Sequence, residues 1–300
     1  MEVVETAEQP NRPRLMGGAM DGTSSPVSDS RPASACRATE TTSFVFALGR
    51  VEPRFSSPAV EKEFAQAVGR TDTAGQNDRQ TLHAILADRA NRYLARHMCW
   101  VFTIEGLETY ILVPRDPSDV ELLIDAVRSR PQPTDVDVVI GQRGPLAPAE
   151  ACGGLSVPIV AFDNLYSFER EELIAAIPRP DGISEDSDDQ FRATATELLD
   201  RIMQMADNAG ATDEHRALNY LAVRYPAIYA RTAEAHHAEG ALTEVEVRPS
   251  RLSGTRRIVD TIFSYTHRRT DVTDKCFARV DVTEKFPFLV TKLSPYYERT

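Results

Sequence analysis

The chain predicts an α+β protein with antiparallel strands near both ends and a helical hairpin between them. Residues 44–48 and 98–113 are apolar runs separated by turn residues, as expected for buried strands. Residues 190–237 carry apolar side chains at helical spacing, whereas residues 241–293 alternate between apolar and polar side chains. Strands grouped on both sides of a run of helices favour α+β over a βαβ alternation.

The chain divides into a tail and one domain. Residues 1–42 are rich in Ser, Thr, Pro, Gly and Ala and show no apolar periodicity. Such a segment buries too little surface to offset its ordering entropy, so we expect a disordered tail over 1–42. The remaining residues, 43–300, are enough for a single α+β domain with its own core.

The first ordered elements are a strand and several helices. The run Phe44–Leu48 predicts a buried strand that Gly49 ends. A Ser-Pro pair then predicts a helix over 58–68, with serine as the N-cap and proline in the first turn. Apolar spacing over 78–98 predicts two short helices, or one helix broken near Asn91.

The segment His97–Pro114 raises the question of a metal or thiol site, because it begins with a His-x-Cys pair. Its aromatic side chains alternate with Cys99, Val101 and Thr103, and Glu105-Gly106 is a turn signal. A hairpin buried on both faces accounts for this pattern. Metal sites need three or four converging ligands, and only two ligand types occur here. We therefore favour a structural role for His97 and Cys99.

Shorter elements follow. Asp116-Pro117 opens a predicted helix with Ser118 and Glu121 as a capping box. Residues 136–144 predict a strand ended by glycine, and residues 155–177 a short strand and then a helix. The acidic segment 179–190 lacks the ligand spacing of a calcium-binding loop and predicts a mobile loop.

Two long helices and a meander complete the domain. Residues 190–208 and 213–237 predict an antiparallel helix pair, with Pro226 kinking the second helix. The strands after residue 240 predict an antiparallel β-meander. Within it Cys276, Ala278, Val280 and Val282 alternate with polar or larger residues, as in a sheet with one solvated face.

Charge and cysteine usage limit the classes of function. The net charge of -11 argues against a nucleic-acid surface and against binding to anionic membranes. Arg256-Arg257 and Arg268-Arg269 are the candidates for a local basic patch, although solvated strand ends explain them more simply. The four cysteines are scattered without a CxxC pair, which favours reduced thiols over disulfides. With no signal peptide or membrane helix evident, we expect a cytoplasmic protein.

Known catalytic motifs do not explain the sequence. It contains no G-x-G-x-x-G after a strand, no P-loop, no G-x-S-x-G and no H-E-x-x-H. We assign no catalytic, cofactor-binding or metal-binding residue. An enzyme could use Cys152, His97, His215 and His236 if they converge in space. Two of them within hydrogen-bond reach in a concave pocket would favour this alternative, which stays open.

Several segments, in order, resemble the C-terminal domain of the cyanobactin maturation proteins PatG and PatA. They are FVFALGRVEPRF, DRQTLHAIL, CWVFTIEGLETYILVP, IVAFDNLYSF, RALNYLAVRYPAIY, EVEVRPSRL and VTEKFPFLVTKLSPYYE, between Phe44 and Tyr297. The resemblance implies an α+β fold, a tendency to dimerise and a pathway that makes ribosomally synthesised, post-translationally modified peptides. The domain itself has no settled activity.

Two properties of that family are not carried over to this chain. Its full-length members hold a protease domain, whereas the Asp, His and Ser contexts of a subtilisin-like protease are absent here. Some members bind zinc through Cys and His in the C-terminal meander. The matching segment here, RPSRLSGTRR, contains neither residue, so we expect no zinc site.

The leading hypothesis is a non-catalytic accessory protein that binds a precursor peptide or a peptide-modifying enzyme. An exposed edge of the meander would accept an extended peptide as an added strand, with residues 255–284 as the reporting segment. The first alternative is a peptide-modifying enzyme with the Cys/His site described above. The second is a homodimeric module that tethers a partner through residues 1–42.

Overall fold

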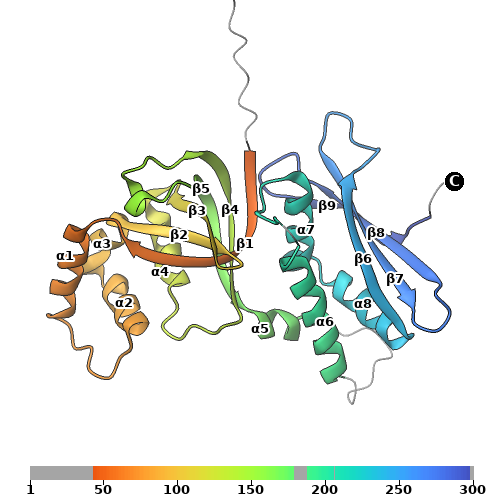
Figure 1. The fold of residues 1–300 in the computed structure, drawn as a ribbon, viewed down its shortest axis with the longest axis horizontal. Coiled ribbons are helices and arrows are strands. Elements are labelled where there is room, and N and C mark those ends of the chain that lie inside the picture. Colours follow the sequence, from red (N-terminus) through yellow and green to blue (C-terminus); the bar gives the residue numbers. More distant parts are fainter. Residues whose placement is uncertain (1–42, 179–187, 206, 298–300) are drawn as a thin grey trace, which may run out of the picture. The chain divides into compact units, whose positions relative to one another are not determined.

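The structure is a computed structural model that describes residues 43–178, 188–205 and 207–297. These described residues belong to one compact unit (Figure 1). The predicted disordered tail and most of the predicted acidic loop lie outside the described residues. The helices are α1 (Pro58–Val68), α2 (Asp78–Ala87), η1 (Arg89–Asn91), α3 (Arg92–His97), η2 (Pro117–Asp119), α4 (Val120–Ala126), η3 (Ala151–Gly154), α5 (Arg170–Ala175), α6 (Asp188–Met203), α7 (Asp213–Arg224) and α8 (Ala227–His237), the three η elements being 3-10 helices.

The strands form a closed barrel and an open sheet, which confirms the α+β class. The barrel strands are β1 (Ser43–Phe55), β2 (Met98–Ile104), β3 (Leu107–Pro114), β4 (Asp135–Leu146) and β5 (Pro158–Glu169), in the order β1-β2-β3-β5-β4. The pair β3–β5 is parallel, and the other barrel pairs are antiparallel. The open sheet has the order β6-β7-β8-β9, with β6 (Gly240–Pro249), β7 (Ile258–His267), β8 (Thr273–Asp281) and β9 (Phe288–Pro295).

Two glycines that were expected to end strands instead lie inside them. At Gly49, β1 passes from pairing with β4 to pairing with β2, and a Cβ there would lie 2.3 Å from the Thr103 carbonyl oxygen. Strand β4 likewise continues past Gly144 to Leu146, and inside it a Cβ at Gly141 would lie 2.4 Å from the Ala161 carbonyl oxygen. The prediction that glycine ends these strands is wrong, because here glycine allows two barrel strands to approach closely.

The hairpin predicted for residues 98–114 is confirmed. Strands β2 and β3 pair antiparallel around the Glu105-Gly106 turn. Trp100 and Phe102 belong to the core inside the barrel, and Cys99 and Val101 belong to a smaller apolar cluster on its outer face. The Trp100 indole Nε1 donates a hydrogen bond to the Ala95 carbonyl oxygen at 2.9 Å. Periodicity therefore identified both faces of this hairpin correctly.

The helices around the barrel largely follow the sequence signals. Helix α1 begins after the predicted N-cap Ser57, and the break near Asn91 is the 3-10 helix η1. The capping box of Ser118 and Glu121 is wrong. Asp116 is the N-cap residue, and its carboxylate accepts a hydrogen bond from the Ser118 backbone nitrogen at 2.8 Å. An aspartate one residue before a proline competes directly for the same backbone donor.

The predicted helix pair is confirmed, and its second member is split. Helix α6 ends at Met203, and the segment expected as one kinked helix forms α7 and α8 on either side of Tyr225-Pro226. Proline has no backbone N–H to donate, so the helix ends there instead of bending. Buried side chains of all three helices share one core with the sheet β6–β9 and with three barrel strands.

The C-terminal meander is confirmed as a four-stranded antiparallel sheet. Helices α7 and α8 lie against one of its faces (Figure 1). Cys276, Ala278 and Val280 point into that core, as the alternation predicted. Asp281 departs from the pattern, since its side chain is buried and paired with Arg256.

A polar contact set fixes α7 to the barrel. The side chain of Asn219 donates to the Phe46 carbonyl oxygen at 2.8 Å and exchanges hydrogen bonds with the buried Asn208 amide. The Phe46 backbone nitrogen donates to the Gly210 carbonyl oxygen at 2.9 Å. Because each group is buried and has a partner, these bonds specify one arrangement of helix and strand.

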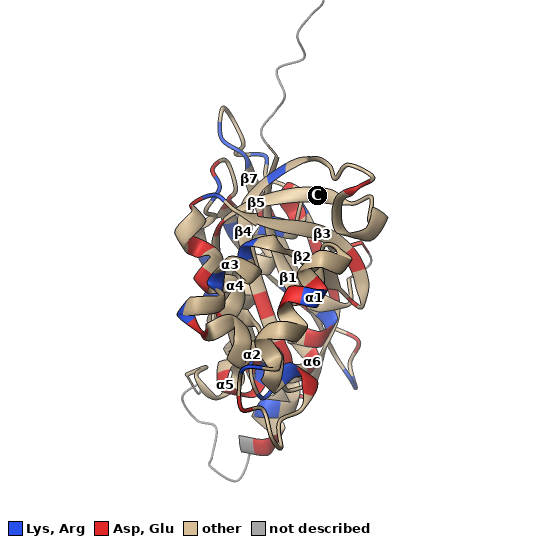
Figure 2. Ribbon diagram, turned by 90° about the vertical axis from the view of Figure 1, so that its left-hand side faces the viewer, with Lys and Arg blue, Asp and Glu red and all other residues tan. Residues whose placement is uncertain are grey.

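Charges on the barrel helices are mixed in sign. Figure 2 shows acidic and basic residues interleaved over α1, α3 and α4, and Arg92 pairs with Glu121 between α3 and α4. Every helix in the described part of the chain is too short or too polar to span a bilayer.

Candidate interaction surface

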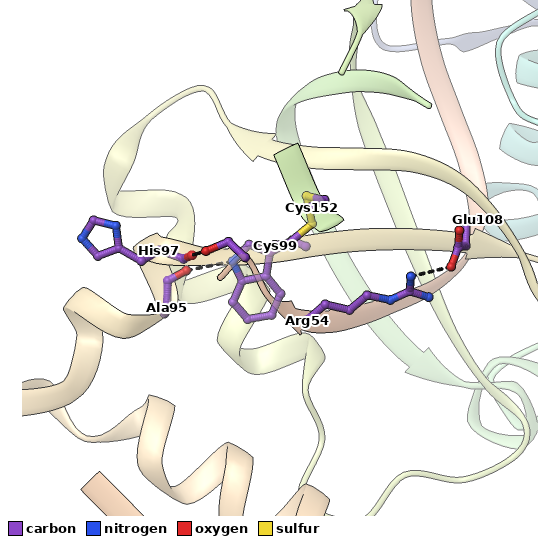
Figure 3. The surroundings of a disulfide bond; sticks show 8 residues. Arg54, Ala95, His97, Cys99, Glu108 and Cys152 are labelled. Atoms are coloured by element: carbon purple, nitrogen blue, oxygen red, sulfur yellow. Dashed lines mark hydrogen bonds and ion pairs between the residues drawn. A yellow bond between two sulfur atoms is a disulfide. The ribbon is translucent and has the colours of Figure 1, made fainter. Parts of the chain in front are cut away.

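The sequence raised the question whether His97 and Cys99 belong to a metal or thiol site. In the structure Cys99 forms a disulfide. The Sγ atoms of Cys99 and Cys152 are bonded (Figure 3). The prediction of reduced thiols is wrong for these two residues, because a separation of 53 residues gives no signal in the sequence. His97 ends α3 as expected; its ring is exposed and its carbonyl oxygen accepts a hydrogen bond from Ser56 Oγ at 2.5 Å.

The residues of the enzyme alternative occupy different elements. His97 ends α3, Cys152 lies in η3, His215 in α7 and His236 in α8. Across residues 43–178, 188–205 and 207–297, no hydrogen bond joins any two of them, and no three His, Cys, Asp or Glu side chains gather as metal ligands. Burial lowers the pKa of His215, and its Nδ1 atom is buried without a hydrogen-bond partner.

The unpaired cysteine among the described residues is a core residue. Cys276 is buried in β8 beside an open hollow of about 510 Å³ that Arg231 and Tyr296 help to line. Burial raises the pKa of this thiol to about 11. The thiolate is the nucleophilic form, so Cys276 is inert at neutral pH.

The outer edges of the sheet β6–β9 are partly blocked. On β6, the Arg201 guanidinium donates to the carbonyl oxygens of Leu242 and Thr243 at 2.6 and 2.7 Å, where the strand bulges. On β9, the Leu293 backbone nitrogen donates to the Tyr225 hydroxyl at 2.9 Å. Natural sheets protect their edges with such side chains and bulges. Residues 255–284, which were expected to report edge binding, belong to the central strands β7 and β8 and their flanking loops, and that expectation stays a prediction.

A buried arginine holds the loop between β8 and β9. Arg216 in α7 is 1 % exposed and donates to the carbonyl oxygens of Val282, at 2.7 Å, and Glu284. Burial lowers its pKa to about 10, so it is charged at neutral pH. Burying a guanidinium is costly unless its donors are satisfied. These carbonyl oxygens accept from both terminal nitrogens of Arg216, whereas its Nε is buried without a hydrogen-bond partner. The apolar face of α7 includes Arg216 and Asn219, and polar residues at these positions were the sequence signal of this role.

Two further contacts fix the same loop. Arg257 donates from its backbone nitrogen to Thr283 Oγ1 at 2.7 Å and from its guanidinium to the Thr283 carbonyl oxygen at 2.9 Å. Lys285 Nζ lies 2.6 Å from Asp163 Oδ1 of β5. The loop is thus bonded to α7, to the segment before β7 and to the barrel, which leaves it little freedom to move.

This anchored loop and the start of β9 present apolar side chains to solvent. Phe286, Phe288 and Val290 are 49 %, 46 % and 42 % exposed. Arg256 lies over the Phe288 ring at 5.1 Å, and Lys285 Nζ lies 5.7 Å from the centre of the Phe286 ring. We call these five residues the β9 surface. Clustered apolar side chains on a rigid element are typical of an interaction site.

The four arginines considered as one basic patch do not form one. Arg256-Arg257 precede β7 and Arg268-Arg269 follow it. A strand of this length separates them by about 30 Å at 3.3 Å per residue. Arg257 pairs with Asp213 and Arg269 with Glu239. They are strand-end charges, as the simpler interpretation held.

The comparisons with known proteins agree with the resemblance found in the sequence. Residues 185–296 match the family model described as PatG C-terminal. A solved structure named "PatG Domain of Unknown Function" matches with a TM-score of 0.70 and 20% sequence identity, over 85% of this chain and 98% of that chain. The search of curated proteins gives no match. The resemblance is confirmed, the likeness in structure concerns the fold, and the β9 surface lies within the residues that the family model matches.

Proposed function

We propose that this protein is a non-catalytic accessory protein in a cyanobactin-like pathway of peptide modification, and that it binds a precursor peptide or a peptide-modifying enzyme through the β9 surface. The proposal rests on the match of residues 185–296 to the PatG C-terminal family. It places the protein in the cytoplasm, where ribosomal precursor peptides are made. We also propose that two copies of the chain associate as a homodimer, which light scattering would test.

The main observation behind this proposal is that the backbone of the β8–β9 loop is held in place while its aromatic side chains are exposed to solvent. Arg216 and Arg257 hold the loop backbone, while Phe286 and Phe288 remain half exposed. A partner that binds there does not have to order the loop first, so little of the binding free energy is lost to entropy. Exposed aromatic rings suit a peptide with aromatic or aliphatic side chains, while the cations over them, Arg256 and Lys285, are already paired with Asp281 and Asp163.

Strand addition remains the proposed geometry, now limited to the first half of β9. Near Leu293 the edge is occupied by the Tyr225 hydroxyl, and on β6 Arg201 occupies the edge at Leu242. An added strand would therefore run along residues 288–290, next to the exposed side chains. The Cys/His alternative gains no support, because Cys152 is bonded to Cys99 and the three histidines are not joined.

The test is an affinity capture from the native host, read by mass spectrometry. The tagged protein is compared with a variant carrying Phe286→Ser and Phe288→Ser. A control variant carries Leu107→Ser and Val272→Ser, which removes two apolar side chains elsewhere that are even more exposed than the two rings. Burial of the two rings predicts at least about a tenfold loss of the partner in the first variant and none in the control.

Each outcome decides a different part of the proposal. A short precursor peptide or a modifying enzyme captured by the unchanged protein supports the function. Capture of the protein alone contradicts it. A partner that the Phe286/Phe288 variant retains refutes the β9 surface and leaves the function standing.

A further inference from the structure

The disulfide joins a buried strand residue to an exposed loop. Cys99 in β2 is 3 % exposed, whereas Cys152 lies in a partly exposed turn of the segment 147–157, which connects β4 to β5. We call this segment the 147–157 loop. Figure 3 shows the bond between the two elements, with the ion pair of Arg54 and Glu108 beside it. A thiol in solution therefore meets Cys152 before Cys99.

Little besides this bond fastens the apex of the loop. At its base, the Ala147 backbone nitrogen donates to the Val157 carbonyl oxygen at 2.9 Å. Within the loop, the Ala151 nitrogen donates to the Pro148 carbonyl oxygen at 2.9 Å. In the part of the chain that the structure describes, no hydrogen bond leads from residues 148–156 to another element. The other contacts of the apex are apolar packing.

The backbone around Cys152 favours release once the bond is gone. Cys152 has φ 50°, and Gly153 and Gly154 have φ 70° and 92°. The left-handed region is unfavourable for a residue with a side chain, and the two glycines lose much conformational freedom when held. The disulfide and the packing offset these costs, so removing the disulfide shifts the equilibrium toward an open loop.

The loop covers apolar groups on the outer face of the barrel. Val101 in β2 is fully buried and Ile111 in β3 is 6 % exposed, although both belong to the outer cluster. The partly buried loop residues Ala151, Leu155 and Val157 pack against this cluster. An open loop would expose an apolar strip beside the Arg54–Glu108 pair, and such a strip can bind another apolar surface.

We infer that Cys99–Cys152 is a reversible redox site, cleaved by a dithiol reductant, and that its cleavage releases the 147–157 loop and uncovers the outer face of the β2–β3 hairpin. This inference does not depend on the proposed function. It assigns the pair a chemistry that the sequence alone did not indicate.

The exchange proceeds in two balanced steps. A thiolate of the reductant attacks Cys152 Sγ, the Cys99–Cys152 bond breaks, and its electron pair goes to Cys99 Sγ, which takes up a proton. The second thiol of the reductant then attacks the mixed disulfide and releases Cys152 as a thiol, while the reductant becomes a disulfide. Apolar surroundings disfavour a Cys99 thiolate as the leaving group, so the first step is slow. A dithiol is effective because its second thiol completes the reaction.

The test uses the unchanged protein in two redox states. Thiol alkylation with mass spectrometry shows whether Cys99 and Cys152 are blocked without reductant and both labelled after dithiothreitol. Limited proteolysis with a Glu-specific protease then compares cleavage after Glu150, in the loop, with cleavage after the exposed Glu105 in the β2–β3 turn. We expect reduction to raise the Glu150 rate at least about tenfold, as a lost cross-link shifts local opening, and to leave the Glu105 rate unchanged.

A variant with Cys99→Ser and Cys152→Ser separates the bond from the reductant. It should be cleaved at Glu150 at the rate of the reduced protein, with or without dithiothreitol. Equal Glu150 rates in the oxidised and reduced unchanged protein would overturn the inference. So would free labelling of both cysteines before reduction, after exposure of the protein to a mild disulfide oxidant.

Discussion

Replacing Arg216 with methionine tests whether the buried guanidinium holds the β8–β9 loop. Methionine fills much of the same volume and cannot donate hydrogen bonds. Val282, whose carbonyl oxygen accepts from Arg216 at 2.7 Å, is fully buried, so this oxygen would lose its donor without gaining water. An orphaned buried acceptor costs about 1–3 kcal/mol.

The second acceptor behaves differently. Glu284 is exposed, so water can replace the arginine at its carbonyl oxygen. Removing the guanidinium also relieves its desolvation, which offsets part of the loss. With the lost attachment of the loop, we expect Arg216→Met to lower the free energy of unfolding by roughly 2–3 kcal/mol.

The assay is urea unfolding followed by circular dichroism, with Arg269→Met as the control. The Arg269 side chain is 76% exposed and its ion pair is with Glu239, so its replacement should cost less than about 0.5 kcal/mol. Hydrogen exchange of residues 282–287 should also accelerate in Arg216→Met alone. A change below about 1 kcal/mol, with unaltered exchange, would refute the role given to Arg216.

The remaining predictions concern the barrel and its junction with α7. Burial raises the pKa of Asp137, whose carboxyl accepts from Ser167 Oγ and from the Val51 nitrogen. Its contribution to stability is therefore complete below about pH 3.8 and declines as pH rises through the folded pKa. As the pH rises from about 4 to 7, the free energy of unfolding of Asp137→Asn should increase relative to that of the unchanged protein. A difference between the two free energies that does not vary with pH would contradict the raised pKa of Asp137. Gly210→Ala should cost more than about 2 kcal/mol, because its φ is 70° and a Cβ would lie 2.4 Å from the Phe46 carbonyl oxygen. Gly75→Ala has a similar φ of 79° with open space, so it should cost only about 1 kcal/mol in thermal unfolding, and equal losses would show that the contact is unimportant.

Local patterns predicted most of the elements, and long-range contacts decided what they missed. Alternation identified the meander because one face of its sheet is buried, and apolar runs on either side of a turn signal identified the β2–β3 hairpin, whose strand β2 is buried on both faces. Barrel closure depends on Gly49 and Gly141 approaching backbone segments that are distant in the sequence, and no local pattern records such an approach. The Cys99–Cys152 disulfide was missed for the same reason, because it joins residues that are distant in the sequence.

The β9 surface was missed for a different reason. Residues 286–290 have the apolar composition of a buried strand, so composition alone assigns them to the core. Their exposure follows from the position of β9 at the edge of the sheet and from the anchoring of the preceding loop by Arg216. Arg216 itself could have been noticed as a charge on the apolar side of a helix, but its acceptors lie 66 and 68 residues away.

The redox site and the β9 surface are connected by a continuous set of contacts, yet we expect them to act independently. The 147–157 loop leads into β5, and Asp163 of β5 pairs with Lys285 in the β8–β9 loop. Contact alone does not transmit a change; coupling requires an element with two arrangements that both sites bias. Strand β5 is paired with β4 along nearly its whole length and with β3 on its other edge, so release of the loop leaves it no second register. Reduction should therefore speed hydrogen exchange in residues 148–156 and leave exchange in residues 282–287 unchanged. If both segments respond to reduction and Lys285→Met removes the response of the second, then β5 does transmit the change and the two sites form one switch.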